Sequence, residues 1–538
     1  MTTTRRAFLK QLGCGAAGLG FISVIPSSTA ASWFGGRKLP RSTPEAEGVA
    51  SAGILAFLDA AAQARHEMHS FMLVRHGRVV AEGWWSPYGP QFNHTMYSMS
   101  KSFTSTAVGF AVAEGRLTVN DKVVSFFPND LPATVSDNLA ALRVKDMLSM
   151  AVGHDKDPTF EVVKHENWAK AFLDWPIPHA PGTKFVYNSA ATYMCSAIVQ
   201  KLTGQKIIAY LKPRLFDPLG VEGPTWETCP RGICTGGWGL SIQTEGLAKF
   251  GQLYLQKGLW KGRQILPAKW IEEATTFKIQ QPLPAKPARP NAQNDWLQGY
   301  CYQFWRAQHN AYRGDGAFGQ FTIVMPDQDA VIAITSESKS MQGQLDLVWE
   351  HLLPAMKASP LPADAETQAR LKQTLSSLAL TLPKQQPSRS ENAIHQTAAR
   401  VSGKTFKFEA NVLGLQSVSF AFRKDGCLVT FKDVIASHPI ACGNERWERS
   451  ETALPGTPPR LISGGAPKPG TKSKLAASGT WKDENTFEMM WRYYETPHHD
   501  TVTCRFDGDK VAIEFAASIG ANKRPVLQGQ IPRACTIY

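Results

Sequence analysis

Long hydrophobic runs are missing from most of the sequence. Beyond the first thirty residues, no apolar stretch approaches the ~18–20 residues that cross a membrane, so we expect no transmembrane segment. Runs of basic residues are missing too: the formal net charge is +13, but Lys and Arg are spread along the chain. This distribution argues against a nucleic-acid groove. It favours a solvated basic surface, or weak attraction to an anionic cell envelope.

Metal-binding cysteine patterns are also absent. There is no Cys-x-x-Cys pair and no group of Cys and His with the spacing of a zinc or haem site, so we expect neither a metal nor a cofactor. The "PHHD" stretch at Pro497–Asp500 is interpreted as a turn between strands rather than a metal site. Of the nine cysteines, Cys229 and Cys234 in "CPRGIC" are the closest pair. In an oxidising compartment they could close a small disulfide loop or stay reduced.

Residues 1–30 have the pattern of an export signal. "TRRAFLK" (Thr4–Lys10) precedes an apolar, Gly-rich run and then "SSTA", which is typical of a twin-arginine signal. We expect cleavage after Ala30 and a periplasmic or secreted protein; the alternative is a basic amphipathic first helix. "GCGAAG" (Gly13–Gly18) has the spacing of a dinucleotide-binding loop. It follows no strand and opens no βαβ unit, so we reject that interpretation.

Length and composition predict more than one globular domain. The chain has 538 residues, 43% hydrophobic and 19% charged, which exceeds the size of an ordinary single domain. Within residues 31–356, strand-like segments stand at both ends of a helical middle, which predicts an α+β domain whose sheet is completed by distant parts of the chain. The expected strands lie in Phe71–Trp85, Gly299–Ala307, Gly319–Pro326 and Ala330–Ser336.

The composition changes after this domain. Residues 357–394 are rich in Pro, Ser, Gln and Ala, with one predicted helix at residues 364–378, and we interpret them as a linker. Residues 395–538 alternate apolar and polar side chains around Asp-Gly turns, as in "SVSFAFRKDGCLVTFKD". This pattern predicts a separate antiparallel β domain, either a small barrel or a sandwich.

Two Ser-x-x-Lys pairs compete as a catalytic dyad, Ser98 with Lys101 and Ser336 with Lys339. Ser98 opens a helical stretch, "SMSKSFTSTAVGFAVAEG", so Lys101 lies about one turn further on nearly the same face. The helix N-terminus offers free N–H groups where an oxyanion can form, and a desolvated lysine can activate the serine. Ser336 follows a strand and leads into no apolar helical face, so its lysine is expected to be solvated. The context predicts a nucleophile at Ser98.

Five stretches carry a family resemblance. In chain order they are "MYSMSKSFTSTAVGFAVAEGRL", "VKDMLSMAVGH", "GTKFVYNSAATYMCSAIVQKLTG", "GGWGLSIQTEGLAKFGQLYLQKG" and "GDGAFGQFTIVMPDQDAVIAI". Their order and spacing resemble the serine β-lactamase and penicillin-recognising hydrolase family, nearest its class C-like esterase and 6-aminohexanoate-dimer hydrolase branch. The resemblance covers roughly residues 40–355 and implies a β-lactamase-like fold, with an antiparallel sheet flanked by helices. It says less about residues 395–538, although hydrolases of this family often carry an extra β domain.

The resemblance implies roles for individual residues. Ser98 would form the acyl-enzyme with Lys101 as its partner, and Tyr187, in the family's Tyr-x-Asn element, would relay a proton. A nearby ammonium at Lys101 would favour the Tyr187 phenolate, which could take the Ser98 proton. The element here reads Tyr-Asn-Ser because Ser189 replaces the usual Asn, a departure found in the nylon-oligomer branch that puts β-lactam specificity in doubt. Trp238, in "GGWGLS", would either line the cleft or pack in the core.

The family's Lys-Thr-Gly strand element is missing. "GDGAFGQF" takes its place, where Gly316 would let the backbone approach closely and the Ala317 N–H would join that of Ser98 as an oxyanion donor. Losing that lysine removes the group that would hold a substrate carboxylate, such as that of a penicillin. Asp315 and Arg313 are expected to be exposed turn residues rather than determinants of selectivity.

These observations predict an exported serine hydrolase that cleaves a small-molecule amide or ester through an acyl-enzyme on Ser98. A β-lactamase, a D-amino-acid peptidase or a penicillin-binding protein acting on cell-wall peptides stays open as an alternative. So does a relative that binds such peptides without turnover, although the intact Ser98, Lys101 and Tyr187 disfavour it. A cofactor-loaded redox protein would fit the export signal, but the lack of a ligand cluster argues against it. The sequence indicates no oligomeric state.

Overall fold

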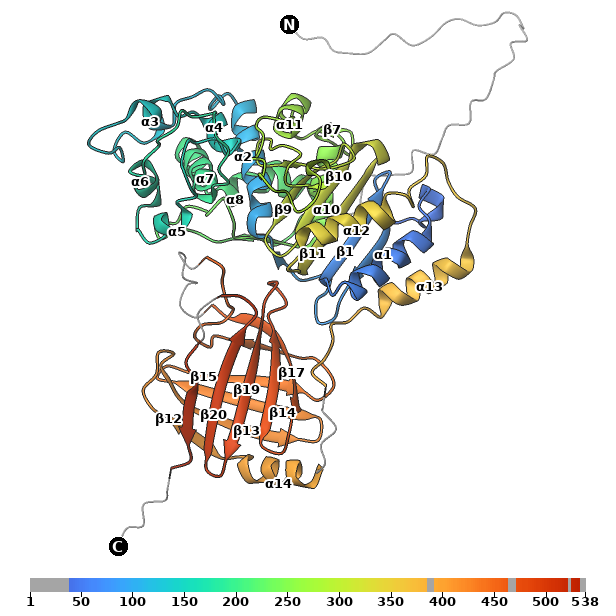
Figure 1. The fold of residues 1–538 in the computed structure, drawn as a ribbon, viewed down its shortest axis with the longest axis vertical. Coiled ribbons are helices and arrows are strands. Elements are labelled where there is room, and N and C mark those ends of the chain that lie inside the picture. Colours follow the sequence, from blue (N-terminus) through green and yellow to red (C-terminus); the bar gives the residue numbers. More distant parts are fainter. Residues whose placement is uncertain (1–37, 385–390, 463–470, 521–523, 533–538) are drawn as a thin grey trace, which may run out of the picture. The chain divides into compact units, whose positions relative to one another are not determined.

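The computed structural model describes residues 38–384, 391–462, 471–520 and 524–532. The predicted export signal therefore lies outside the described residues. The described chain contains a domain of mixed helices and strands followed by an all-β domain (Figure 1). This succession confirms the predicted α+β class.

The first domain is built on a six-stranded antiparallel sheet with the strand order β2-β1-β11-β10-β9-β8. Its strands are β1 (Glu67–Arg75), β2 (Arg78–Trp84), β8 (Trp305–Arg306), β9 (Tyr312–Gly316), β10 (Gln320–Met325) and β11 (Ala330–Glu337). β1 pairs with β11 from Glu67↔Glu337 to Arg75↔Ala330, so the two ends of the domain meet at the centre of the sheet. This pairing confirms the prediction that distant parts of the chain complete the sheet.

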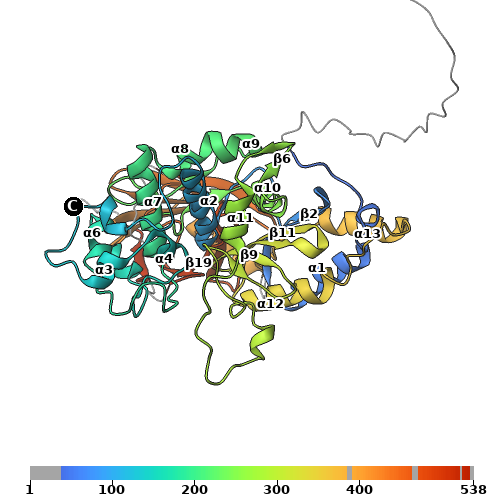
Figure 2. The ribbon, with the colours of Figure 1, turned by 90° about the horizontal axis from the view of Figure 1, so that it is seen from above.

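Each face of the sheet has its own core, because successive strand residues point to opposite faces. Phe71 and Leu73 of β1 belong to the core that α1, α12 and α13 share, whereas Met72 and Val74 belong to the core that includes α10 (Figures 1 and 2). These helices are α1 (Ser51–Gln63), α10 (Thr244–Leu255), α12 (Met341–Leu347) and α13 (Ala365–Ser376). The alternation explains why β1 is buried almost throughout rather than amphipathic.

α2 (Ser100–Ala113) is the central helix of the first domain and packs on α7 (Ser189–Thr203). Its residues from Ser100 to Ala111 are all buried. The remaining α-helices of the domain are α3 (Asp137–Ala141), α4 (Val144–Leu148), α5 (Thr159–Val162), α6 (Trp168–Leu173), α8 (Ile207–Leu211), α9 (Asp217–Leu219) and α11 (Ala268–Thr275). Short 3-10 and π segments are η1 (Glu45–Glu47), η2 (Tyr97–Met99), η3 (Val123–Phe126), η4 (Lys212–Phe216), η5 (Asn291–Gln293), η6 (Pro326–Gln328) and η7 (Val348–Leu352). Minor strands are β3 (His94–Thr95), β4 (Thr225–Trp226), β5 (Leu240–Ile242), β6 (Leu259–Trp260) and β7 (Arg263–Gln264).

The second domain is a closed barrel, which settles the choice between barrel and sandwich. In the described part of the chain, nine strands follow one another in the order β15-β14-β13-β12-β21-β20-β19-β18-β17, and a parallel pairing of β15 with β17 closes the ring. The strands are β12 (Thr405–Phe408), β13 (Leu415–Arg423), β14 (Gly426–Asp433), β15 (Ser437–Gly443), β17 (Ser473–Trp481), β18 (Thr486–Arg492), β19 (His499–Asp507), β20 (Lys510–Ala517) and β21 (Leu527–Gln530), with β16 (Glu448–Thr452) added beside β17. Apolar side chains, among them Phe420, Phe431 and Trp491, pack inside it.

The segment predicted as a linker is partly structured. The helix expected near residues 364–378 is present as α13, which packs on α1 and β2 and buries Leu371. Leu380 N–H then donates to the Ser86 carbonyl oxygen at 2.9 Å. The first half of the predicted linker therefore belongs to the α+β domain. α14 (Glu391–Val401) packs against β13 of the barrel instead.

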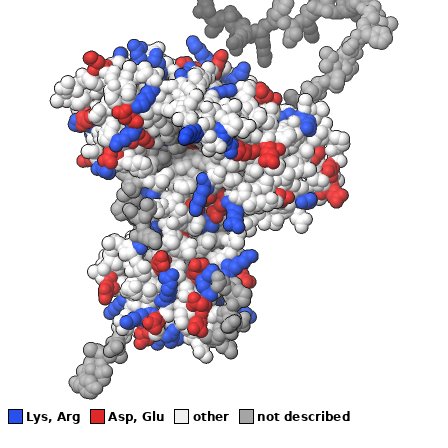
Figure 3. Space-filling view, viewed as in Figure 1, with Lys and Arg blue, Asp and Glu red and all other residues white. Residues whose placement is uncertain are grey.

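Cysteines and surface charge can be compared with their predicted behaviour over the described residues. Cys229 and Cys234 are buried free thiols, so the possible disulfide is not formed. No helix within the described ranges is both long and apolar enough to cross a membrane. On the face drawn in Figure 3, basic and acidic side chains are interspersed over both domains, the pattern of a solvated surface.

Candidate active site

Ser98 lies at the start of the central helix. η2 runs directly into α2 at Ser100, which confirms the prediction that Ser98 opens a helical stretch. N–H groups in the first turn of a helix have no carbonyl partner within it, so this position favours negative charge. Tyr97, just before the serine, has a φ of +46°, in the left-handed region that bulky residues rarely adopt. The chain therefore turns sharply at the candidate nucleophile.

Lys101 lies one turn beyond Ser98 and is buried. Its Nζ is 2.9 Å from Ser98 Oγ, 2.9 Å from Ser189 Oγ and 2.8 Å from the Gly237 carbonyl oxygen. A carbonyl oxygen can only accept, so Nζ donates to Gly237. A neutral amine in this position keeps a lone pair that can accept the Ser98 hydroxyl proton. The structure thus brings together three of the predicted site residues.

The charge on Lys101 is suppressed by its surroundings. Burial lowers the pKa of Lys101 to about 7, although the carboxylates of Asp157 and Asp315 act in the opposite direction. A large fraction of the molecules therefore carries a neutral Lys101 near neutral pH. That form is the one able to act as a base toward Ser98.

Tyr187 covers the amine from the segment that leads into α7. Lys101 Nζ is 4.7 Å from the centroid of the Tyr187 ring. On its other contacts, Tyr187 stacks on Trp305 with the ring centroids 5.5 Å apart and meets Tyr300 edge-on at 6.2 Å. These aromatic rings wall one side of the Ser98–Lys101 pair.

The pKa of Tyr187 departs from the expectation that Lys101 would favour the phenolate. Burial raises the pKa of Tyr187 above its ordinary value, as does the charge of Asp315, while a hydrogen bond with Ser98 lowers it. The physical reason is desolvation, which disfavours the charged forms of both the phenol and the amine. This direction favours Lys101 as the base and Tyr187 as a phenol that donates a proton.

Within the Tyr-Asn-Ser element, Asn188 has a structural role and Ser189 contacts the candidate site. Asn188 caps α7: its side-chain oxygen accepts from the Ala191 N–H at 2.9 Å, and its Nδ2 lies 2.9 Å from His154 Nδ1. Ser189, the first residue of α7, holds Lys101 Nζ. The serine that replaces the family's Asn therefore keeps a hydrogen bond to the lysine.

β9 approaches η2 very closely at its C-terminal end. A Cβ built on Gly316 would lie 2.1 Å from the Met96 carbonyl oxygen, so only glycine fits there. Ala317 follows in the tight turn between β9 and β10. This placement brings the segment that carries Ala317 against the start of the central helix. Its role as the second oxyanion donor stays a prediction.

The expectation that Arg313 and Asp315 are exposed turn residues is wrong. Both lie on β9 and are only 0% and 7% exposed, and Arg313 Nε donates to Asp315 Oδ2 at 3.1 Å. The residues form a strand paired with β10 rather than a turn, and all five residues of β9 are buried. Burial raises the pKa of Asp315, while the charges of Arg313 and Lys101 lower it. The pair belongs to the charge environment of Lys101.

Trp238 packs in the core. Its side chain is 5% exposed, and its ring stacks on Trp168 with the centroids 5.7 Å apart. Its carbonyl oxygen accepts from Trp226 Nε1 at 2.8 Å. This placement favours the packing role over the cleft-lining role, which stays a prediction.

The second Ser-x-x-Lys pair does not form a dyad. Ser336 Oγ donates to the carbonyl oxygens of Phe318 and Gly319, at 2.7 and 3.0 Å. Lys339 is exposed, as predicted. Ser336 is therefore a structural residue that fixes the turn after β9.

Comparison with known proteins identifies the family. The family model described as Beta-lactamase matches residues 58–353, more than half of the chain. The chain belongs to the Beta-lactamase family. Its similarity to known hydrolases places it among the serine hydrolases of that family.

Relatives of the protein include two curated hydrolases. It is 26% identical to the 6-aminohexanoate-dimer hydrolase of Paenarthrobacter ureafaciens over 284 residues, which cover 49% of this chain and 71% of the relative. It is 21% identical to the N-acetylmuramyl-L-alanine amidase of Bacillus subtilis (strain 168) over 306 residues, 46% of this chain and 68% of the relative. Among solved structures, the octameric penicillin-binding protein homologue from Pyrococcus abyssi is 14% identical, with a TM-score of 0.45, and covers 89% of this chain and 99% of its own.

Several residues at this Beta-lactamase-family site were not recognised from the sequence. Asp157, which raises the pKa of Lys101, also accepts from the Thr159 N–H at 3.0 Å, just before α5. Tyr300 lies in the loop before β8, and Trp305 begins β8, which is much shorter than the strand predicted over Gly299–Ala307. No local sequence pattern identifies Asp157, Tyr300 or Trp305 as residues of the site.

Proposed function

We propose that this serine hydrolase cleaves an amide or ester bond through an acyl-enzyme on Ser98. The observation that carries the proposal is the buried Lys101, whose Nζ lies 2.9 Å from Ser98 Oγ and whose pKa is lowered to about 7. A serine hydroxyl is a poor nucleophile unless a neighbouring base accepts its proton. A neutral lysine at hydrogen-bond distance meets that requirement.

The reaction proceeds in two acyl-transfer steps. Lys101 takes the hydroxyl proton as Ser98 Oγ attacks the substrate carbonyl carbon, and the N–H groups of Ser98 and Ala317 bind the resulting oxyanion. Tyr187, a phenol next to both Ser98 and Lys101, passes a proton to the leaving amine or alcohol as its bond to carbon breaks, and regains one through Lys101. Water then attacks the acyl-enzyme with the same groups in reverse, which releases the acid and restores Ser98.

The surroundings of the site favour a linear amide or ester over a penicillin. The buried Arg313 side chain donates through Nε to Asp315 and through Nη1 to two backbone carbonyls, and we assign no residue to the place of the lysine of the missing Lys-Thr-Gly element. The similarity to a 6-aminohexanoate-dimer hydrolase supports an amide substrate. A cell-wall peptide is the second candidate, which the similarity to an N-acetylmuramyl-L-alanine amidase favours.

The test of this proposal is the Ser98→Ala variant. We expect it to lose turnover and covalent labelling by a fluorophosphonate probe, because no other hydroxyl is bonded to Lys101 in the nucleophile's position. Circular dichroism should be unchanged, since Ser98 fills little space. Labelling that persists in Ser98→Ala, or a wild-type burst without further turnover, would refute the proposal; the second result would favour a protein that binds without turnover.

A substrate panel would separate the candidate activities. The purified protein should be assayed against p-nitrophenyl esters, linear amide oligomers, D-amino-acid amides and nitrocefin. Faster hydrolysis of the esters or linear amides than of nitrocefin is expected, because the site has no lysine of the Lys-Thr-Gly type. Preference for nitrocefin would move the protein to the β-lactamase branch.

We also propose that the protein is exported through the twin-arginine route. The support is the Arg5-Arg6 pair in its "TRRAFLK" context. Replacing both arginines by lysine should retain the longer precursor in the cytoplasm of an expressing bacterium, as cell fractionation would show. Normal export of that variant would contradict the proposal.

A further inference from the structure

A loop of the barrel contacts the segment that precedes Ser98. This loop, residues 493–498, joins β18 to β19; of the turn predicted at "PHHD", Pro497 and His498 lie in the loop, whereas His499 and Asp500 begin β19. The Glu495 carbonyl oxygen accepts from the Thr95 N–H at 3.0 Å, and the Thr496 carbonyl oxygen accepts from the Tyr88 hydroxyl at 3.0 Å. The loop is therefore hydrogen-bonded to the segment that leads into η2.

His498 carries the contact furthest toward the site. Its side chain is fully buried, and its Nε2 is hydrogen-bonded to the Tyr97 hydroxyl. Its ring meets Phe318 edge-on with the centroids 4.8 Å apart, and Tyr97 and Phe318 are themselves 5.6 Å apart. One barrel histidine thus joins two aromatic residues of the hydrolase domain.

These two aromatic residues are the chain neighbours of the two oxyanion donors. Tyr97 precedes Ser98, and Phe318 follows Ala317. Both have left-handed backbones, with φ of +46° and +68°. Side chains of this size adopt that conformation only where the surroundings hold it, and such residues cluster at functional sites. The direction of each donor N–H depends on the backbone that these aromatic side chains anchor.

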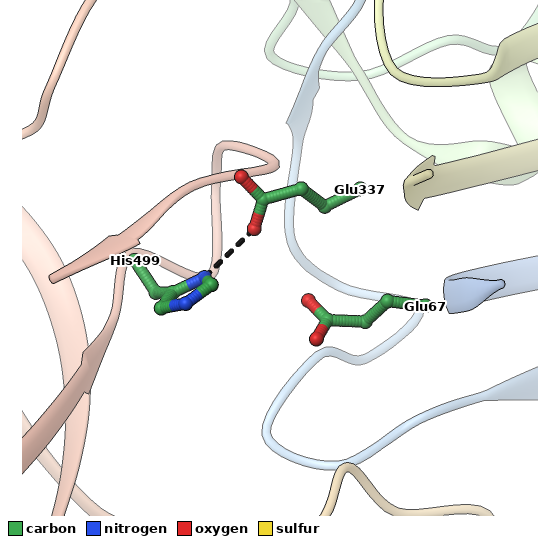
Figure 4. A group of neighbouring side chains, drawn as sticks. All are labelled: Glu67, Glu337 and His499. Carbon is green, nitrogen blue, oxygen red and sulfur yellow. Dashed lines mark hydrogen bonds and ion pairs between the residues drawn. The ribbon is translucent and has the colours of Figure 1, made fainter. Parts of the chain in front are cut away.

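The rear of His498 is fixed by a cluster of charged groups. His498 Nδ1 lies 2.9 Å from Glu337 Oε1, and His499 Nδ1 lies 2.8 Å from Glu337 Oε2. Glu67, Glu337 and His499 are close enough to surround one cation (Figure 4). The Arg492 guanidinium is that cation, because it donates to Glu67 and lies 3.7 Å from Glu337. The cluster therefore serves to orient His498, and we assign no metal to it.

We infer that His498 is a positioning residue of the barrel that holds the oxyanion hole formed by Ser98 and Ala317. The inference rests on the proposed acyl-enzyme function. The hydrogen bond to Tyr97 and the ring contact with Phe318 keep two strained backbone segments at the spacing that one oxyanion requires. The barrel thereby contributes to transition-state binding without touching the substrate.

The first experiment compares His498→Ala with wild type in the full chain. We expect kcat for p-nitrophenyl acetate to fall by about 10-fold or more while KM changes by less than about twofold, because a misplaced donor is felt mainly in the transition state. The affinity for a boronic acid, whose adduct with Ser98 places an oxygen in the hole, should fall by a similar factor. His438→Ala is the matched control, since His438 is a buried barrel histidine bonded to Asp433 at 2.9 Å. It should leave kcat and boronate affinity unchanged.

Two further variants separate positioning from folding. Tyr97→Phe removes the hydroxyl that His498 and the Leu461 backbone bind, so it should lower kcat in the same direction, and most of its effect should not add to that of His498→Ala. His498→Gln keeps an amide that can bond the Tyr97 hydroxyl and should recover part of the lost kcat. If His498→Ala fails to fold, Tyr97→Phe and His498→Gln decide the question.

The inference would be overturned by unchanged kcat and boronate affinity in His498→Ala and Tyr97→Phe, or by an equal loss in His438→Ala. It would also be overturned if KM rather than kcat carried the whole effect. Failure of the proposed function looks different, because the wild type itself would then show no fluorophosphonate label at Ser98.

Discussion

At the scale of single residues, the site depends on keeping Lys101 uncharged. In water the Lys101 amine and the Tyr187 phenol would have their ordinary pKa values. Burial lowers the pKa of the amine and raises that of the phenol. In the proposed mechanism these directions make Lys101 a neutral base for Ser98 and Tyr187 a neutral proton donor for the leaving group. The serine, lysine and tyrosine could be named from the sequence because their motifs are local. The pKa directions could not, since desolvation depends on residues that fold around the site from elsewhere.

The buried lysine predicts a distinctive pH profile. We expect kcat/KM for a p-nitrophenyl ester to rise with pH through about 7 and then level off, because only neutral Lys101 accepts the Ser98 proton. Asp157→Asn should move the midpoint to lower pH, since the Asp157 charge raises the pKa of Lys101. Asp155→Asn is the control, because Asp155 is paired with His179 and Lys184 at the surface. A midpoint that stays fixed in Asp157→Asn would contradict this account.

At the scale of elements, the β9–β10 hairpin shows where sequence-based prediction ends. Alternating apolar residues predicted the strands, and with the Asp-Gly turns they predicted an antiparallel β domain that could be a barrel or a sandwich. The pattern does not specify which strand is a neighbour, so the closure of the barrel by β15 and β17 and the packing of α13 on α1 were not foreseen. For the same reason Asp315 was placed in a turn: "RGDG" has the composition of a turn, but its pairing with β10 makes it a strand.

The close approach of β9 to η2 can be tested at Gly316. Gly316→Ala would place a methyl group 2.1 Å from the Met96 carbonyl oxygen, so β9 must move away from the start of α2. We expect a fall in kcat of ~10²-fold and a loss of about 1–3 kcal/mol in the free energy of unfolding. Gly89→Ala, whose new methyl group meets only the flexible end of Gln91, should change neither. Full activity in Gly316→Ala, measured beside denaturant unfolding, would show that the spacing of β9 and η2 is not critical.

At the scale of the whole molecule, ion pairs bind the barrel to the hydrolase domain. Arg492, at the end of β18, donates to both carboxylate oxygens of Glu67, at the start of β1, with Nη2 2.9 Å from Oε2. Hydrogen bonds to His69 and the charge of Arg492 lower the pKa of Glu67 to about 2 against the effect of burial. No local sequence pattern predicts this ion pair, because Glu67 and Arg492 are separated by most of the chain. The contact between the two domains can therefore be identified only from the folded structure.

The lowered pKa of Glu67 fixes how acid should act on this interface. A carboxylate whose pKa is lower in the folded state stabilises the protein at pH values above its ordinary pKa of 4.5, and that contribution is lost as pH falls from about 4.5 to about 2. Glu67→Gln should therefore lower the free energy of unfolding by about 2 kcal/mol at pH 7 and flatten its decline between pH 5 and 3. Glu161→Gln removes an exposed pair with Lys164, which contributes little, and should leave the curve unchanged. Urea unfolding followed by tryptophan fluorescence would measure both. If the free energy of unfolding of Glu67→Gln fell with pH in the same way as that of wild type, the pair of Arg492 and Glu67 would not stabilise the folded chain. The hydrogen bonds around Tyr97 and Thr95 would then hold the barrel in place without that pair.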